Sequence, residues 1–438
     1  MNTTSETPRR YAVISADSHA GADLLDYKPY LEKKWYDEFD AWAAAYSNPW
    51  DFMDPRVPEE GQEDEFLYIA TSSWHCTLNW DSDKRKKHLT QEGVVGEVLY
   101  PNTAPPFMPT SVLEGKIPKN RQEYEQRWAG LQAHNRWLQD FCDDWKGHRA
   151  GVAQIMLYDI DDAIKEVREL RANGLRGGVL LPMGGKETIT LSFANPEYDR
   201  LWAVCEELDV PVHQHGSTPY VEPDSNPVDI AMALAEFSFF NRRIVTQMMY
   251  AGVFERFPRL KLVIAEVGSG WVPQHLAQLD GFYYYGTFPG EGPFKNELKE
   301  AMGSLSMSPS EYFARNCYLG ASLLMRSEVA ARENIGVDKM MWGMDYPHAE
   351  GTYPYTLKAL QLAFQGAPEE DTRKMLGTSA AELFDFDLAQ LQKLADEVGP
   401  TVADVFQAPV DAPQFGADSF SPVFSEGSVD AIAEIITA

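Results

Sequence analysis

The chain has 438 residues, of which 44% are hydrophobic and 12% aromatic, so it can bury a large core. Its 38 Lys and Arg against 66 Asp and Glu give a formal net charge of -28, which argues against binding to nucleic acid or anionic membranes. Scattered cysteines, a polar N-terminus and the lack of an apolar run of membrane-spanning length predict a cytoplasmic protein.

The first predicted strand covers residues 11–16 (YAVISA), and Asp17 and His19 follow it. Side chains two residues apart on an extended chain share a face, so we expect these two to project together from the strand's end. The alternative is an aspartate that caps the next segment beside a solvated histidine.

Residues 21–90 form a long segment without a clean period, rich in aromatic side chains such as Trp35 and Trp74. Long insertions in compact domains are usually functional or disordered, and this aromatic content favours order. We expect the segment to cap the first strand's carboxyl end and to place Trp74 against an aromatic or bulky apolar substrate.

Three further apolar runs predict strands at residues 94–100, 150–157 and 177–182, separated by helical patterns. Asn102 leaves the first of these strands in the same way as Asp17 leaves its own. We therefore expect Asn102 to contact the substrate.

The next two strands carry candidate site residues at their ends. Residues 210–216 (VPVHQHG) place His213 and His215 on one face, and residues 260–265 are followed by Glu266. A single buried histidine is usually a core residue, but two on one face favour metal or substrate contact.

The last two strands are predicted at residues 316–321 and 339–343, and Asp345 and His348 follow the second. A buried strand that ends in a carboxylate and an imidazole is typical of the catalytic end of a barrel. The alternative is an ordinary turn, because Asp-Tyr-Pro also suits one.

Eight buried strands separated mostly by helices predict an α/β fold of the (β/α)8 TIM-barrel type, with residues 1–398 as one domain. A doubly wound sheet is the alternative, but its glycine-rich fingerprint is absent. An acidic helix at 378–398 closes the barrel, and residues 399–438 form an arm that wraps the barrel, reaches a partner or is disordered. The arm's apolar residues favour a homodimer or higher assembly.

The converging strand ends predict a site for one divalent metal, with zinc first and manganese, iron or cobalt as alternatives. The expected ligands are two histidines and two carboxylates, which balance a dication: Asp17, His19, His215 and Asp345. Glu266 as a fifth ligand would leave the site negative, which favours it as a supporting group or proton carrier. Asp345 is the expected acid–base group, and His348 and His213 are left as substrate-binding or supporting groups.

The chain resembles the amidohydrolase superfamily, and within it the branch of aminocarboxymuconate-semialdehyde decarboxylase and the resorcylate decarboxylases. The stretches that carry the resemblance are ISADSHAG, VPVHQHG, FERFPRLKLVIAEVGSGWVPQHL and MMWGMDYPH. It implies a metal-dependent barrel, often dimeric, with Asp17, His19, His215 and Asp345 at ligand positions. Many members have a histidine where this chain has Glu266, and in the decarboxylases that histidine is tied to catalysis.

Three functions are compatible with these residues. The first is metal-dependent hydrolysis of a small amide, ester or lactone by an activated water. The second is metal-dependent, non-oxidative decarboxylation of an aromatic or related acid. The third is a barrel that binds a small molecule without turnover, against which the full set of carboxylates and histidines argues.

Overall fold

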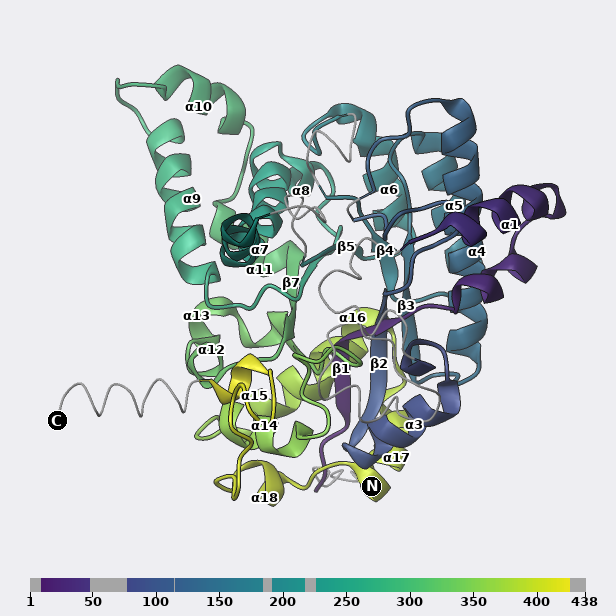
Figure 1. Cartoon of the computed structure of the whole chain (residues 1–438). Helices are drawn as coiled ribbons and strands as arrows, with labels where there is room; N and C mark the ends of the chain where they lie inside the picture. Colours follow the sequence, from purple (N-terminus) through teal and green to yellow (C-terminus); the bar gives the residue numbers. More distant parts are fainter. Residues whose placement is uncertain (1–8, 48–76, 114, 184–190, 217–225, 426–438) are drawn as a thin grey trace, which may run out of the picture.

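The computed structural model describes residues 9–47, 77–113, 115–183, 191–216 and 226–425 (Figure 1). Its centre is an eight-stranded parallel sheet in which the strands follow one another in chain order. The strands are β1 (Val13–Ala20), β2 (Val94–Pro101), β3 (Arg149–Gln154), β4 (Gly178–Leu180), β5 (Val212–His215), β6 (Leu262–Ala265), β7 (Cys317–Ser322) and β8 (Met340–Gly343). The predicted (β/α)8 barrel is confirmed.

Helices surround the sheet. Those up to β6 are α1 (Tyr36–Ala45), α3 (Ser82–Gln91), α4 (Arg121–Asp143), α5 (Ile160–Ala172), α6 (Asp199–Glu207), α7 (Pro227–Tyr250) and α8 (Val253–Arg256). Those after it are α9 (Val272–Thr287), α10 (Lys295–Met302), α11 (Pro309–Asn316), α12 (Arg326–Ala330), α13 (Arg332–Ile335), α14 (Thr356–Ala363), α15 (Glu369–Arg373), α16 (Ser379–Phe384), α17 (Leu388–Val398) and α18 (Val402–Val405). Among the described residues, no helix combines the length and apolar character needed to cross a membrane.

Most strand residues are buried because each strand separates two layers of core. On β6, Ile264 packs outward with the surrounding helices, whereas Val263 packs inward with the barrel interior. The interior is closed at the amino-terminal side of the strands by α16, whose Phe384 belongs to the same inner cluster and stacks on the His213 ring of β5. Among the described residues, this packing leaves the carboxyl ends of the strands as the place for a site.

The barrel closes between β1 and β8 through a short seam rather than a long ladder. An isolated parallel bridge joins Ser18 to Tyr346. The His19 amide donates to the Tyr346 carbonyl at 2.7 Å, and the Asp345 amide donates to the Asp17 carbonyl at 2.9 Å. Close approach requires Gly343, since a Cβ there would lie 2.7 Å from that of Asp17.

The described part of the segment between β1 and β2 has two roles. Its early part, from the 3-10 helix Leu24–Tyr30 through α1, packs beside α4, where Trp35 contacts Phe107. Its later part is α3, which packs on β2 as an ordinary barrel helix, so the expected insertion ends before α3 rather than at residue 90. Trp74 lies outside the described residues.

The C-terminal region corrects the predicted helix and fits the first of the three alternatives given for the arm. The helix expected over 378–398 is two helices, α16 and α17, because Asp385 takes a left-handed backbone with φ of 58°. The described part of the arm packs on its own barrel: α18 lies against α14, and Val405 and Phe424 are buried there. Burial of these two side chains therefore needs no second subunit.

Candidate functional site

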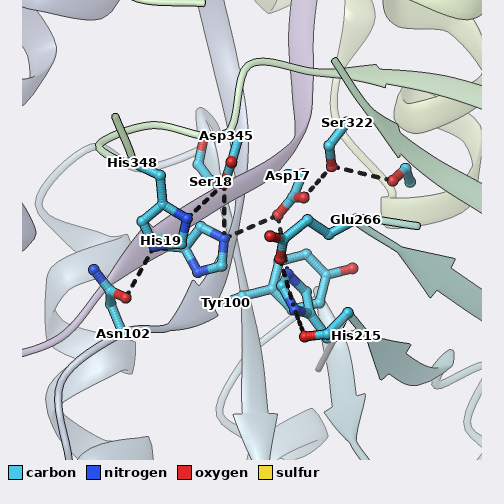
Figure 2. A network of polar contacts seen from close by, with 12 residues as sticks. Asp17, Ser18, His19, Tyr100, Asn102, His215, Glu266, Ser322, Asp345 and His348 are labelled. Carbon is cyan, nitrogen blue, oxygen red and sulfur yellow. Dashed lines mark hydrogen bonds and ion pairs between the residues drawn. The ribbon is translucent and has the colours of Figure 1, made fainter. Parts of the chain in front are cut away.

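The ends of β1, β5, β6 and β8 bring polar side chains to one mouth, shown in Figure 2. Asp17 and His19 lie within the last part of β1, not beyond it as expected, and His215 ends β5. Glu266 follows β6 directly, and Asp345 lies two residues after β8. Both have a left-handed backbone, with φ of 56° and 57°. Such a conformation is uncommon for residues other than glycine and is often found at functional sites.

One group of donor atoms comes from Asp17, His19, His215 and Glu266, whose nearest ligand atoms all lie within 4.8 Å of one another. Asp17 Oδ1 lies 3.4 Å from His19 Nε2 and 3.3 Å from His215 Nε2. The other nitrogen of His215 lies 3.1 Å from Glu266 Oε2. The structure thus brings Glu266 into the same group as three of the predicted ligands.

Asp345 links this group to a second one. Its Oδ1 lies 3.1 Å from His19 Nε2 and 2.9 Å from His348 Nδ1. Glu350 joins Asp345, His348 and Glu266 in a further cluster of donor atoms within 4.8 Å. The mouth therefore gathers four carboxylates and three imidazoles.

Burial and neighbouring charges shift the pKa values of two of these groups. Burial, together with Asp345 and Asp17, holds the pKa of Glu266 well above its usual range. Burial also opposes the charged form of His19, but its contacts with Asp17 and Asp345 outweigh it and raise its pKa to about 9. The neighbouring carboxylates therefore favour a positive charge on His19 and a retained proton on Glu266.

The same residues fit a divalent cation. Both ring nitrogens of His19 and both carboxylate oxygens of Asp345 are buried without an aligned hydrogen bond in the described part of the chain. Buried polar atoms normally have such partners, so converging lone pairs of this kind suit a metal ion. Imidazole and carboxylate donors are acceptable to zinc and to manganese.

His213 does not reach this group. It lies two residues before His215 on β5, which places it deeper inside the barrel on the same inward face. Its Nε2 lies 2.6 Å from the Gly177 carbonyl, its Nδ1 lies 2.8 Å from the Tyr100 hydroxyl, and its ring stacks on Phe384. Both ring nitrogens thus contact protein groups, and the substrate contact of His213 stays a prediction.

The remaining sequence candidates have mixed outcomes. Asn102 is buried at the mouth, where its Oδ1 lies 3.1 Å from His348 Nε2. His348 and Asp345 are neighbours, as their positions after β8 predicted. Trp74 cannot be placed, because it lies outside the described residues.

Three contributors were missed in the sequence. Ser322 ends β7 and donates from its hydroxyl to Asp17 Oδ2. The ring of Tyr100 on β2 lies 4.5 Å from that of His215. The strand-end rule that selected Asp345 could have found both, but Glu350 sits in a loop without such a signal.

Arg85, on α3, supports the seam from beneath the site. It is fully buried, pairs with Glu97 at 2.7 Å, and donates to the His19 carbonyl at 2.7 Å. Its guanidinium also lies 4.7 Å from the centre of the Tyr346 ring. A buried ion pair thus holds the backbone on both sides of the seam.

Known proteins share this architecture. Residues 73–386 match the sequence profile of the family described as Amidohydrolase. Decarboxylase orsB of Emericella nidulans is 28% identical over 171 residues, which are 35% of this chain and 46% of that protein. Gamma-resorcylate decarboxylase of a Rhizobium species is 24% identical over 267 residues, which are 58% of this chain and 75% of that protein.

A solved structure shows the same fold. The 5-carboxyvanillate decarboxylase of Novosphingobium aromaticivorans, solved with bound manganese, superposes with a TM-score of 0.61 at 16% identity. The superposition covers 86% of this chain and 97% of that one. The match to orsB, by contrast, spans less than half of that protein.

Proposed function

Because the chain belongs to the amidohydrolase family, we propose that it is a metal-dependent, non-oxidative decarboxylase of a hydroxylated aromatic acid. The observation that carries the proposal is the position of Asp345, a buried carboxylate between His348 and the donor group of His19. This arrangement would put a proton-carrying pair beside the proposed cation site. The choice of reaction follows the relatives, which are described as decarboxylases of such acids.

The cation would be held by Asp17, His19 and His215, with Glu266 and Asp345 as the adjoining carboxylates. When bound, it would supply a Lewis acid that polarises the acidic oxygens of the substrate. Manganese joins zinc as a leading candidate because the solved relative contains it.

The chain's own residues would manage the proton. Decarboxylation breaks the bond from the ring carbon to the carboxylate, releases carbon dioxide, and leaves the bonding pair on the ring carbon, which takes up a proton. His348 Nδ1, 2.9 Å from Asp345 Oδ1, is placed to supply that proton, and Asp345 is the proposed group that passes it to the ring carbon. Burial of both Asp17 and Asp345 keeps bulk water from their carboxylates.

Hydrolysis, the first function expected from the sequence, is the second candidate. It is favoured by Glu266, a carboxylate that lies in the donor group at a position where many family members have histidine. A carboxylate there could take a proton from an attacking water. The relatives support decarboxylation better than hydrolysis.

The experiment compares both reactions on one preparation. The purified protein, reconstituted with manganese or zinc, is incubated with a panel of hydroxybenzoates in deuterated water. Decarboxylation would release carbon dioxide and place one deuterium on the ring carbon that lost the carboxylate. Cleavage of amides, esters or lactones, with no carbon dioxide from any acid, would contradict the proposal and favour the second candidate.

A further inference from the structure

We propose that Asn102 is a positioning residue that fixes the orientation and tautomer of His348, so that His348 Nδ1 faces Asp345. This inference rests on the proposed function, in which those two residues share the reacting proton. It differs from the expectation that Asn102 binds the substrate.

Asn102 is held by the protein through its backbone and through both polar atoms of its side chain. It is buried just after β2, and its backbone amide donates to the Ala20 carbonyl at 3.0 Å. The side-chain nitrogen donates to Asn79 Oδ1 at 2.7 Å, and the side-chain oxygen faces His348 Nε2 at 3.1 Å. Asn79 is itself fully buried, and its carbonyl accepts from the Gly21 amide at 3.2 Å.

This chain of contacts has a direction. The Asn102 nitrogen is directed to the oxygen of Asn79, so its amide oxygen is turned to the imidazole of His348. An amide oxygen can only accept a hydrogen bond, so His348 Nε2 must carry hydrogen. The ring edge that carries Nδ1 then faces Asp345 Oδ1, 2.9 Å away, and is the edge at which His348 would exchange a proton.

The ring of His348 is also held sideways, since it stacks on the ring of His19 at 3.9 Å between centres. Stacking fixes the plane of the ring but not which edge faces Asp345. Asn102 supplies the missing restraint, because a flipped ring would turn a carbon toward its amide oxygen.

The test uses two variants and one control. Asn102→Ala removes the acceptor, whereas Asn102→Asp keeps an oxygen for His348 and loses the donor to Asn79. Asn173→Ala, at an exposed position after α5, is the matched control and should behave as wild type. Asn102→Ala should lower kcat about 10- to 100-fold, the usual range for groups that orient a ligand from outside, with KM and metal content unchanged. Asn102→Asp should recover most of that loss.

A second readout does not depend on turnover. Nitrogen-15 spectra of histidine-labelled protein, metal-free or zinc-loaded, report which ring nitrogen bears hydrogen, and a His348→Gln variant identifies the signal. Hydrogen on Nε2 in wild type, lost or redistributed in Asn102→Ala, is the expected result. This readout stands even where no hydroxybenzoate is decarboxylated, so failure of the proposed function and failure of this inference are distinguishable.

Two results would overturn the inference. A neutral His348 with hydrogen only on Nδ1 would show that Asn102 donates to the ring instead of accepting from it. A raised KM with unchanged kcat in Asn102→Ala would instead place the side chain on the substrate.

Discussion

Asp345 and Glu266 are carboxylates of the same mouth whose neighbours act on them in opposite ways. Burial opposes ionisation of both, but His348 and His19 hold the pKa of Asp345 below its usual value. Glu266 has Asp345 and Asp17 nearby, and its pKa is raised. Divergent carboxylates of this kind often take different parts in acid–base chemistry, so their variants should differ.

Asp345→Asn should lower turnover about 100- to 10,000-fold, because an amide keeps the shape of the side chain but cannot carry the proton. Metal content should fall less, since Asp17, His19 and His215 remain. Glu266→Gln should lower the rate by a smaller factor and weaken metal binding, because Glu266 lies in the donor group. Steady-state kinetics with metal analysis check both variants, and near wild-type turnover by metal-loaded Asp345→Asn would refute the assignment.

Metal binding should release protons. His19, with its pKa raised to about 9, is protonated in the metal-free protein at pH 7 and must lose that proton to become a ligand. Below pH 9 the metal affinity should therefore weaken about tenfold for each unit by which the pH falls and for each proton displaced. Titration calorimetry in buffers of different ionisation enthalpy measures this release, and a buffer-independent heat at pH 7 would contradict it.

At the scale of elements, the sequence was most informative where one physical signal dominates. Each strand overlaps or adjoins a short apolar run, so all eight could be located within a few residues. The period of two correctly put His213 and His215 on one face, but it cannot tell that they lie at different depths. The break between α16 and α17 was missed because a left-handed aspartate leaves no pattern in the apolar spacing.

The candidate site was predictable for the same reason, and incompletely so. Asp17, His19, His215 and Asp345 could be named because parallel strands end at one edge. The position of Glu350 and the hydrogen bond between Asn79 and Asn102 depend on the paths of loops, which no periodicity encodes. Whether Glu266 joins the donor group depends on its backbone conformation, which the residue type does not specify.

On α4, His134 should make stability depend on pH. Burial lowers its pKa to about 4 from 6.5, and neither ring nitrogen has a hydrogen bond among the described residues. The unfolded chain therefore binds this proton first, so the contribution is complete above about pH 6.5 and is lost as the pH falls toward 4. Over that interval the contribution of His134 to the free energy of unfolding amounts to about 3 kcal/mol.

Chemical denaturation of wild type and His134→Leu at several pH values measures this contribution. The free energy of unfolding of the variant, relative to wild type, should rise as the pH falls. Parallel pH profiles for the two proteins would show that His134 does not titrate in this range. The comparison cancels the other titrating groups that both proteins share.

At the scale of the whole molecule, exposed aromatic side chains lie where the chain projects from the barrel. α9 and α10 project from the barrel in Figure 1, and Phe288 and Phe294 there are 59% and 76% exposed. Contiguous exposed apolar surface often marks an interface. We therefore expect a homodimer that uses this projection, whereas the described arm covers its own barrel.

Phe288→Glu with Phe294→Glu should shift a dimer to a monomer in analytical ultracentrifugation, with the circular dichroism of the fold retained. Val410→Glu, at a 77% exposed position on the arm, is the matched control and should leave the assembly unchanged. The opposite pattern would place the contact on the arm, as the sequence suggested.

The short seam between β1 and β8 is the place where the barrel closes. Asp17 and His19 lie on one side of this seam and Asp345 lies on the other, so a cation bound by both sides would hold the barrel closed. A ligand at 100 times its Kd stabilises the closed form by about 2.7 kcal/mol. Deuterium exchange at the amides of His19 and Asp345 should then slow by up to about a hundredfold on metal loading, and far less at Val179 on β4. Amide exchange at the seam would thus report whether the site holds a metal ion, without any substrate.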